Sequence, residues 1–128
     1  MKLNPDCIRD ILITVESKTT LNTPVRFDPH SIPFPASNYS DDEVLYHVKQ
    51  CELSGFFGDE THWFINNGCM VRYLSPAGHQ FLSDIRSDNN WNKTKEIAKN
   101  VGSESLSAIK EIAAGVITSL IQKQLGLL

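Results

Sequence analysis

The pair Asn67-Gly68 constrains this 128-residue chain more than any other local feature. It separates two strand-like segments, residues 61–65 and 69–74, and Asn-Gly suits a two-residue hairpin turn because both residues of that turn need a positive φ. The pair therefore predicts a β-hairpin over residues 60–74. The cross-strand pairs that follow are Ile65 with Met70, Phe64 with Val71 and Trp63 with Arg72.

Alternation along the two strands divides the hairpin residues between two faces. Both faces hold large apolar groups, so we expect one to meet the core and the other a partner or the C-terminal helices. The predicted faces are Phe64, Val71 and Tyr73 on one side, and Trp63, Ile65, Met70, Arg72 and Leu74 on the other.

Two amphipathic helices precede the hairpin. Asn4-Pro5 supplies an N-cap and a proline at the first helical position, which predicts a helix up to about Lys18. Ser40, followed by three acidic residues, predicts a second helix that ends at Gly55. Between them, residues 19–39 contain four prolines, which exclude a long helix, and "PVRFDP" allows only a short extended piece.

Three helical segments follow the hairpin. Ser75-Pro76 predicts a helix whose buried stripe begins at Gly78, and a short amphipathic helix ends at Gly102. The last helix begins at Ser103 or Ser105. The chain is therefore predicted to be α+β and mostly α, with a first domain over residues 1–89 and a C-terminal helical extension over residues 90–128 packed on it.

The order of helix, irregular crossing, helix, hairpin and helix is the layout of a winged helix. The stretch "VLYHVKQCELSGFF", residues 44–57, resembles the recognition-helix end of small bacterial winged-helix repressors, and "LSPAGHQFL" resembles the segment after their wing. With "MKLNPDCIRDIL" and "SDIRSDNNWNKTK", the chain resembles the YjcQ-related family catalogued as domain of unknown function 2513, found in Gram-positive bacteria and their prophages. The resemblance implies a winged-helix fold and leaves the activity open.

Two functions from different classes fit this fold. The first, favoured by the frequency of DNA binding among winged helices, is a DNA-binding transcriptional regulator of bacterial or prophage origin. Its contacts with duplex DNA would come from Tyr46, Lys49, Gln50, Asn66, Asn67 and Arg72. The alternative is a protein-interaction module, such as a phage-encoded adaptor or inhibitor of a host protein. Its contacts would come from Leu45, Tyr46, Leu53, Trp63 and Ile65.

Charge favours the alternative. The whole chain carries 12 Lys and Arg against 15 Asp and Glu, a net charge of -3, so it lacks the general positive field that gathers nucleic acid. The helix after Ser40 carries one lysine against four acids, three of them at the end that would approach the DNA backbone.

The residues that usually carry chemistry are scattered. The four histidines lack H-x-x-x-H spacing, the three cysteines lack C-x-x-C spacing, and neither Cys51 nor Cys69 has an adjacent basic residue. We therefore expect no enzyme activity, no cofactor and no metal. Three unpaired cysteines also fit reduced thiols in a cytoplasmic protein, and the longest apolar run, residues 112–121, is too short to span a membrane.

Two further surfaces stand out near the C-terminus. A basic patch comprises Arg86, Lys93, Lys95 and Lys99, and is interpreted either as a solvated helix face that covers Trp91 or as a phosphate contact. The last helix carries a long apolar stripe, which is either a homodimer seam or a face packed on the first helix, with membrane docking a weaker alternative. The seam candidates are Ile109, Ala113, Val116, Ile117, Leu120 and Ile121.

Overall fold

The computed structural model describes residues 1–34 and 38–127, which form two compact units. The first unit spans Met1–His79 and the second spans Gln80–Leu128. The division falls inside helix α3 (Pro76–Ile85). Among the described residues, no helix has both the length and the apolar character needed to cross a membrane.

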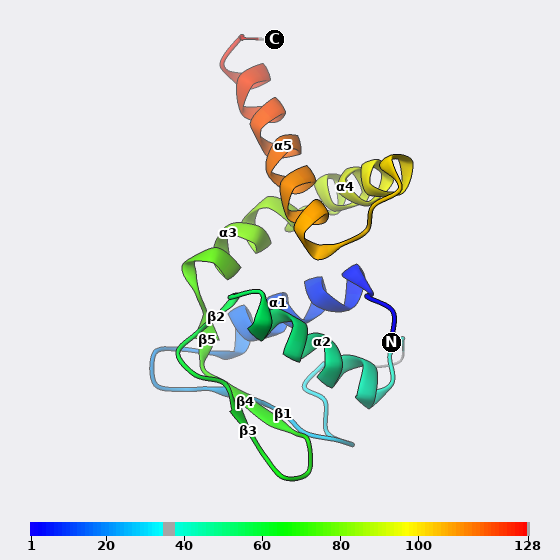
Figure 1. The fold of residues 1–128 in the computed structure, drawn as a ribbon. Coiled ribbons are helices and arrows are strands. Elements are labelled where there is room, and N and C mark those ends of the chain that lie inside the picture. The colour runs from blue at the N-terminus through cyan, green and yellow to red at the C-terminus, as the bar shows by residue number, and fades with distance from the viewer. Residues whose placement is uncertain (35–37, 128) are drawn as a thin grey trace. The chain divides into compact units, whose positions relative to one another are not determined.

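The helices of the first unit begin where the capping signals predict. Helix α1 (Pro5–Lys18) starts after Asn4, whose side-chain oxygen accepts hydrogen bonds from the N–H groups of Asp6 and Cys7. Helix α2 (Asp41–Leu53) starts after Ser40, whose hydroxyl accepts from the N–H of Glu43 at 3.1 Å. The two helices pack against each other and bury a shared apolar face (Figure 1).

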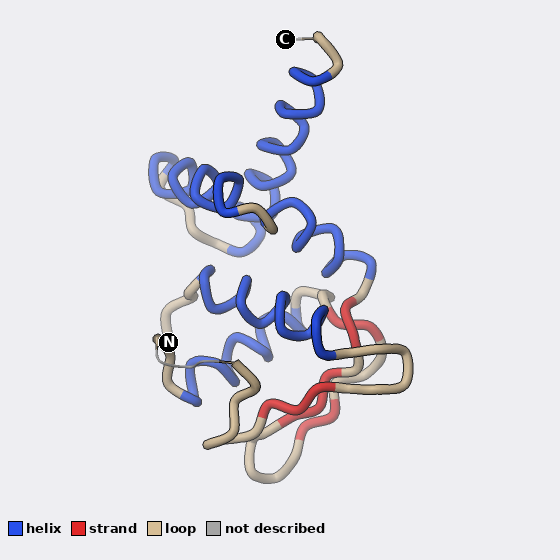
Figure 2. The backbone as a smooth tube through the Cα atoms, turned by 180° about the vertical axis from the view of Figure 1, so that it is seen from behind, coloured by secondary structure: helices blue, strands red, loops and turns tan. Residues whose placement is uncertain are grey.

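The crossing between these helices contributes a strand to a small antiparallel sheet. Strand β1 (Val25–Phe27) pairs with β4 (Cys69–Val71), which also pairs with β3 (His62–Trp63), so β4 is the central strand. Strand β2 (Phe57–Gly58) pairs separately with β5 (Tyr73–Leu74). Figure 2 shows these short strands grouped together in the first unit. The expected short extended piece in "PVRFDP" is therefore an edge strand of the sheet.

The hairpin exists, but its predicted register was wrong. Trp63 pairs with Cys69 instead of Arg72, and His62 pairs with Met70. The N–H of Phe64 donates to the carbonyl of Gly68 at 2.8 Å, so the loop contains three residues, 65 to 67. Of the predicted turn pair, Asn67 has a positive φ of 69° and Gly68 does not. A left-handed residue at the end of a three-residue loop is the next most common hairpin design.

Gly68 is required here for a different reason from the one predicted. A Cβ at this position would lie 3.0 Å from the carbonyl oxygen of Phe27 and 2.9 Å from the carboxylate of Asp28. The hairpin turn therefore sits tightly against the end of β1.

The predicted division of the hairpin faces was also wrong in part. Cys69 and Val71 are buried, whereas Met70 is partly exposed and Arg72 is exposed. Leu74, which was placed on the same face as Met70, is buried, because the ladder of β4 ends at Val71 and a new pairing with β2 begins at Tyr73. The change of partner strand at Arg72 breaks the simple alternation.

The second unit is helical. Helix α4 (Asp88–Val101) starts after Ser87 and ends at Gly102, whose φ of 75° is the left-handed conformation expected of a helix cap. Helix α5 (Leu106–Gln124) starts after Ser105, which decides between the two predicted caps, and packs against α4. The fold is α+β and mostly helical, as predicted.

Two glycines give opposite predictions for stability. A Cβ on Gly78 would clash with the backbone carbonyl oxygen of Phe56, so Gly78→Ala should lower the free energy of unfolding by about 3 kcal/mol. Gly115 lies within α5 with nothing within 4 Å of an added Cβ, so Gly115→Ala should raise that free energy by about 1 kcal/mol. Urea unfolding of both variants measures the two changes in the free energy of unfolding. Equal effects of the two changes would contradict the close packing of α3 on Phe56.

Candidate functional site

One face of α2 remains exposed to solvent. Its residues recur at helical spacing on the side opposite the buried face: Asp42, Tyr46, Lys49 and Leu53. Tyr46 is 38% exposed and Leu53 is 70% exposed. We call these four residues, together with the adjoining hairpin residues Trp63 and Ile65, the α2–hairpin surface.

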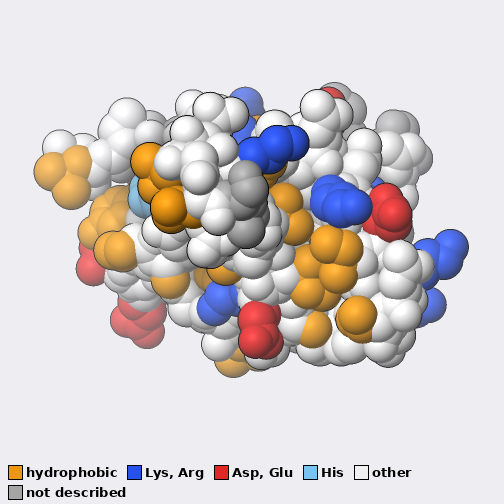
Figure 3. Space-filling view, turned by 90° about the horizontal axis from the view of Figure 1, so that it is seen from above, with side chains coloured by type: hydrophobic (Ala, Val, Ile, Leu, Met, Phe, Trp, Pro, Cys, Tyr) orange, Lys and Arg blue, Asp and Glu red, His pale blue; other side chains and the backbone are white. Residues whose placement is uncertain are grey.

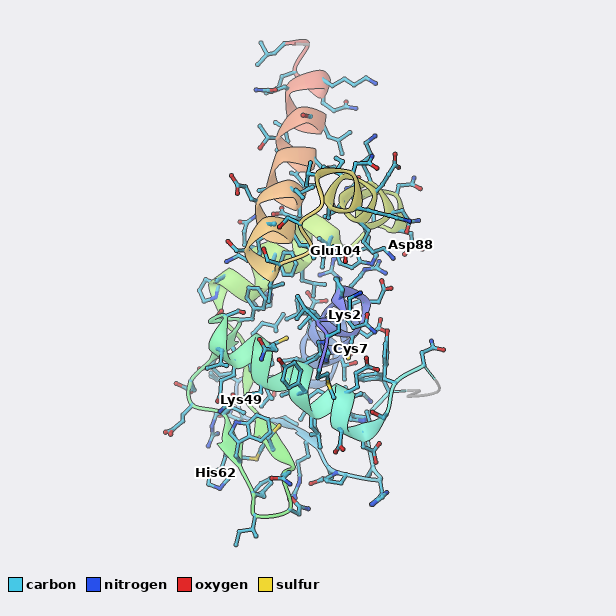
Figure 4. The ribbon with its side chains drawn as sticks, turned by 45° about the vertical axis from the view of Figure 1, so that its right-hand side comes forward. Lys2, Cys7, Lys49, His62, Asp88 and Glu104 are labelled. Carbon is cyan, nitrogen blue, oxygen red and sulfur yellow. The ribbon has the colours of Figure 1, made fainter. Side chains whose placement is uncertain are left out.

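A polar cluster joins the hairpin to α2. The indole N–H of Trp63 donates to both carboxylate oxygens of Glu52, at 3.2 and 3.3 Å. The ammonium group of Lys49 lies 2.7 Å from the same carboxylate and 5.1 Å from the centre of the Trp63 ring. Figure 4 shows Lys49 on α2 near the hairpin that carries His62. The cluster fixes the hairpin on the helix and uses the single lysine of α2 to do so.

Leu45 does not belong to the exposed surface. It was expected among the outward residues of the second helix, but it is 7% exposed and lies with Val44 and Val48 in the core. Gln50 is half-buried at the edge of the exposed face. The predicted contact residues of α2 whose side chains reach the surface are thus Tyr46, Lys49, Gln50 and Leu53.

The predicted residues of the hairpin tip are exposed, and two of them shape the loop itself. The side chain of Asn66 accepts a hydrogen bond from the N–H of Gly68 at 2.9 Å, and Asn67 supplies the left-handed conformation of the loop. Ile65, between them and the strand, is fully exposed. Arg72 is exposed at the other end of the hairpin, where β4 ends. The tip therefore presents an aliphatic side chain and two amides.

The sequence interpretation missed a row of residues on the outer side of the sheet. Arg26, Met70 and His62 are direct neighbours across the three strands. The guanidinium of Arg26 lies 4.5 Å from the centre of the Phe64 ring and donates to both carboxylate oxygens of Asp28, at 3.0 and 3.1 Å. The alternation of Val25, Arg26 and Phe27 was the available signal, but the strand that pairs with β1 lies more than 40 residues away. Because Arg26 is engaged by Asp28, this row carries little free positive charge.

The cysteines lie in environments that disfavour thiolate chemistry. All three side chains are buried. Burial, with smaller contributions from Glu43 and Asp10, raises the pKa of Cys7 to about 12. Burial also raises the pKa of Cys69 to about 12 and that of Cys51 well above its ordinary value. Among the described residues, no group of three or more His, Cys, Asp or Glu is placed to hold a metal ion.

The residues of the basic patch lie in the second unit. Arg86, Lys93 and Lys99 are exposed, and Lys95 is half-buried with its ammonium group 5.4 Å from the centre of the Trp91 ring. Trp91 itself is buried. The stem and charge of Lys95 therefore cover the indole, whereas the other three cations face solvent.

The candidate dimer residues divide into two groups along α5. Ile109 and Ala113 are buried, and Val116 and Ile117 are half-buried. Leu120 and Ile121 are 43% and 53% exposed. Only the second half of the helix thus presents aliphatic side chains to solvent within the described part of the chain.

Comparison with known proteins places the chain among relatives of similar length. The sequence model of the family described as "Hypothetical protein (DUF2513)" matches residues 2–104. An "Uncharacterized protein" of Haemophilus influenzae is 29% identical over 123 residues, which cover 94% of this chain and 99% of the relative. No solved structure matches the chain.

The join between hairpin and helix can be tested with Trp63→Phe. The variant keeps an aromatic ring but removes the indole N–H, so the free energy of unfolding should fall by about 1 kcal/mol. Glu52→Gln and the double variant complete a cycle measured by urea unfolding. The two single effects should not add, because both remove the same interaction. Strict additivity would contradict the hydrogen bond between these side chains.

The buried thiols predict a loss of stability in alkali. Unfolded cysteines ionise near their ordinary pKa of 9.0, whereas folded Cys7 and Cys69 keep their protons up to about pH 12. The unfolded state therefore binds fewer protons in this range, and the free energy of unfolding should fall as the pH rises from about 9 toward 12. Urea unfolding at several pH values measures the slope, which should be shallower in Cys7→Ala. Fast reaction of the native thiols with a disulfide reagent at pH 8 would contradict this burial.

Proposed function

Since this chain belongs to the DUF2513 family, whose description assigns no activity, we propose a function from its own architecture: a non-enzymatic regulatory protein that binds another protein through the α2–hairpin surface. The single observation that carries the proposal is the state of Lys49. This residue, the lysine through which α2 would meet phosphate, is bound to Glu52 and covers Trp63.

The charge of the first unit supports the same conclusion. Residues 1–79 contain six Lys and Arg against ten Asp and Glu, which gives a net charge of -4. Asp41, Asp42 and Glu43 crowd the first turn of α2. The carboxylates of this turn would repel the phosphates of a DNA duplex at the point of contact.

The exposed apolar side chains indicate the kind of partner. Tyr46, Leu53 and Ile65 present aromatic and aliphatic surface to water, and Trp63 is half-buried beside Lys49. Tyrosine and tryptophan are enriched at the centres of protein–protein interfaces, where they contribute large contact areas. Rigid attachment of the hairpin to α2 keeps these groups in fixed positions, which lowers the entropic cost of binding.

A DNA-binding regulator is the second candidate, and the observation that favours it is the order of elements. Helix α1, strand β1 and helix α2 precede a hairpin whose second strand is central in the sheet, an arrangement that suits a wing beside a recognition helix. Exposed Arg72 would then meet phosphate. This candidate needs duplex binding that overcomes the acidic first turn of α2.

A titration against random duplex DNA at low salt separates the two candidates. We expect no salt-sensitive binding at micromolar protein in a fluorescence-anisotropy assay, because the described cations near α2 are paired or few. Binding that weakens steeply with salt and is lost in Arg72→Ala would overturn the protein-interaction proposal.

The surface itself is tested by a capture experiment with matched variants. Tyr46→Ala combined with Leu53→Ala should abolish recovery of the partner that the unaltered protein retains from bacterial extract, and calorimetry with that purified partner should show at least a tenfold loss of affinity. Leu21→Ala is the control, since Leu21 is also a highly exposed aliphatic residue of the first unit but lies outside this surface. Equal loss in the control and the double variant would contradict a specific site.

A further inference from the structure

An open apolar groove lies between α4 and α5, entirely within the second unit. Its volume is about 620 Å³, and four aliphatic side chains line it: Ile97, Ile112, Val116 and Leu120. The volume falls within the range of protein sites that bind ligands, about 300–1,000 Å³. Neither the α2–hairpin surface nor the core of the second unit uses this groove.

Gly115 has no side chain and leaves open space in the groove. This residue lines the groove in the middle of α5, has no positive φ, and would meet nothing within 4 Å if it carried a Cβ. A glycine inside a helix costs about 1 kcal/mol relative to alanine, and here no turn or close approach within the described chain requires it. The backbone of α5 is therefore accessible to another molecule at this point.

Aliphatic side chains are exposed on both helices. Leu120, which lines the groove, is 43% exposed on α5, and Val101 is 65% exposed at the end of α4. On the face seen in Figure 3, hydrophobic side chains lie among Lys, Arg, Asp and Glu side chains. An apolar groove between two helices fits the apolar face of a third helix, which would insert side chains at positions i, i+3, i+4 and i+7.

The charged residues around the groove indicate which charge a partner should carry. Among its described lining residues, the one charged side chain is Lys93, which is exposed on α4. Helix α4 carries three lysines against two acids and α5 carries two lysines against one acid, so each helix has a net charge of +1. The aliphatic lining gives no stacking surface for bases, whereas complementary charge favours an acidic helix.

We propose that the groove between α4 and α5 binds an acidic amphipathic helix of a partner protein. The partner's aliphatic side chains occupy the groove over Gly115, and a carboxylate pairs with Lys93. The site is independent of the α2–hairpin surface, so the failure of one proposal leaves the other standing.

The test uses two fluorescent 18-residue peptides with leucine at helical spacing, one with glutamate and one with lysine at the remaining charged positions. The acidic peptide should bind the full chain with a micromolar Kd and the basic peptide at least tenfold more weakly. Gly115→Leu fills the groove and should weaken binding of the acidic peptide at least tenfold without loss of thermal stability, because its side chain enters open space. Ala114→Leu is the matched control, since Ala114 is exposed on the same helix but does not line the groove, and it should bind normally.

Charge recognition is tested with Lys93→Glu, which should reverse the preference between the two peptides. Three results of the peptide experiments would overturn the proposal, and a fourth concerns the protein alone. The three are equal binding of both peptides, unchanged binding in Gly115→Leu, and a preference for phosphatidylglycerol vesicles that prevents peptide binding. Concentration-dependent self-association that Gly115→Leu abolishes would assign the groove to a second copy of the chain and would also overturn it.

Discussion

A hydrogen bond between Asn4 and His47 joins the two helices of the first unit at their buried face. The backbone N–H of Asn4 donates to Nε2 of His47 at 2.8 Å, while Nδ1 of His47 lies 2.6 Å from the carbonyl oxygen of Glu43. Because Nε2 accepts, Nδ1 carries the proton and donates, so the buried imidazole is neutral and both its nitrogens are used. Asn4 also caps α1 with its side chain. One residue thus begins α1 and links it to α2, and this bond requires the His47 side chain to face inward together with Val44 and Cys51.

The inward position of His47 has a direct consequence for the exposed surface. With His47, Val44 and Cys51 turned inward, the stripe through Tyr46 and Leu53 must face solvent. Trp63 and Glu52 then hold the hairpin at the edge of this stripe. The partner-binding surface proposed above is therefore produced by the same contacts that stabilise the core, and a change at His47 would disturb both.

Local signals predicted most of the helices, and long-range contacts decided what they could not predict. Ser40 and Asn4 each cap a helix through hydrogen bonds to residues two or three positions away, so their effect is readable in the sequence. The hairpin register is not local, because Gly68 must fit against Phe27 in a strand about 40 residues earlier. The same limit applies to the site. Helical spacing predicted the exposure of Tyr46 and Leu53, but the burial of Leu45 depends on which neighbours surround α2, and the row beginning at Arg26 depends on strand pairing.

The two units differ in net charge, and this difference favours partners of different charge at the two proposed surfaces. The first carries a net charge of -4 and the second a net charge of +1, with its lysines on α4 and α5. A basic partner suited to the α2–hairpin surface would be disfavoured at the groove, and an acidic helix suited to the groove would be disfavoured at α2, since like charges oppose each association. Under the two proposals, the surfaces prefer partners of opposite charge, so each favours a different partner. This property distinguishes an adaptor from a simple inhibitor, which needs only one of the two surfaces.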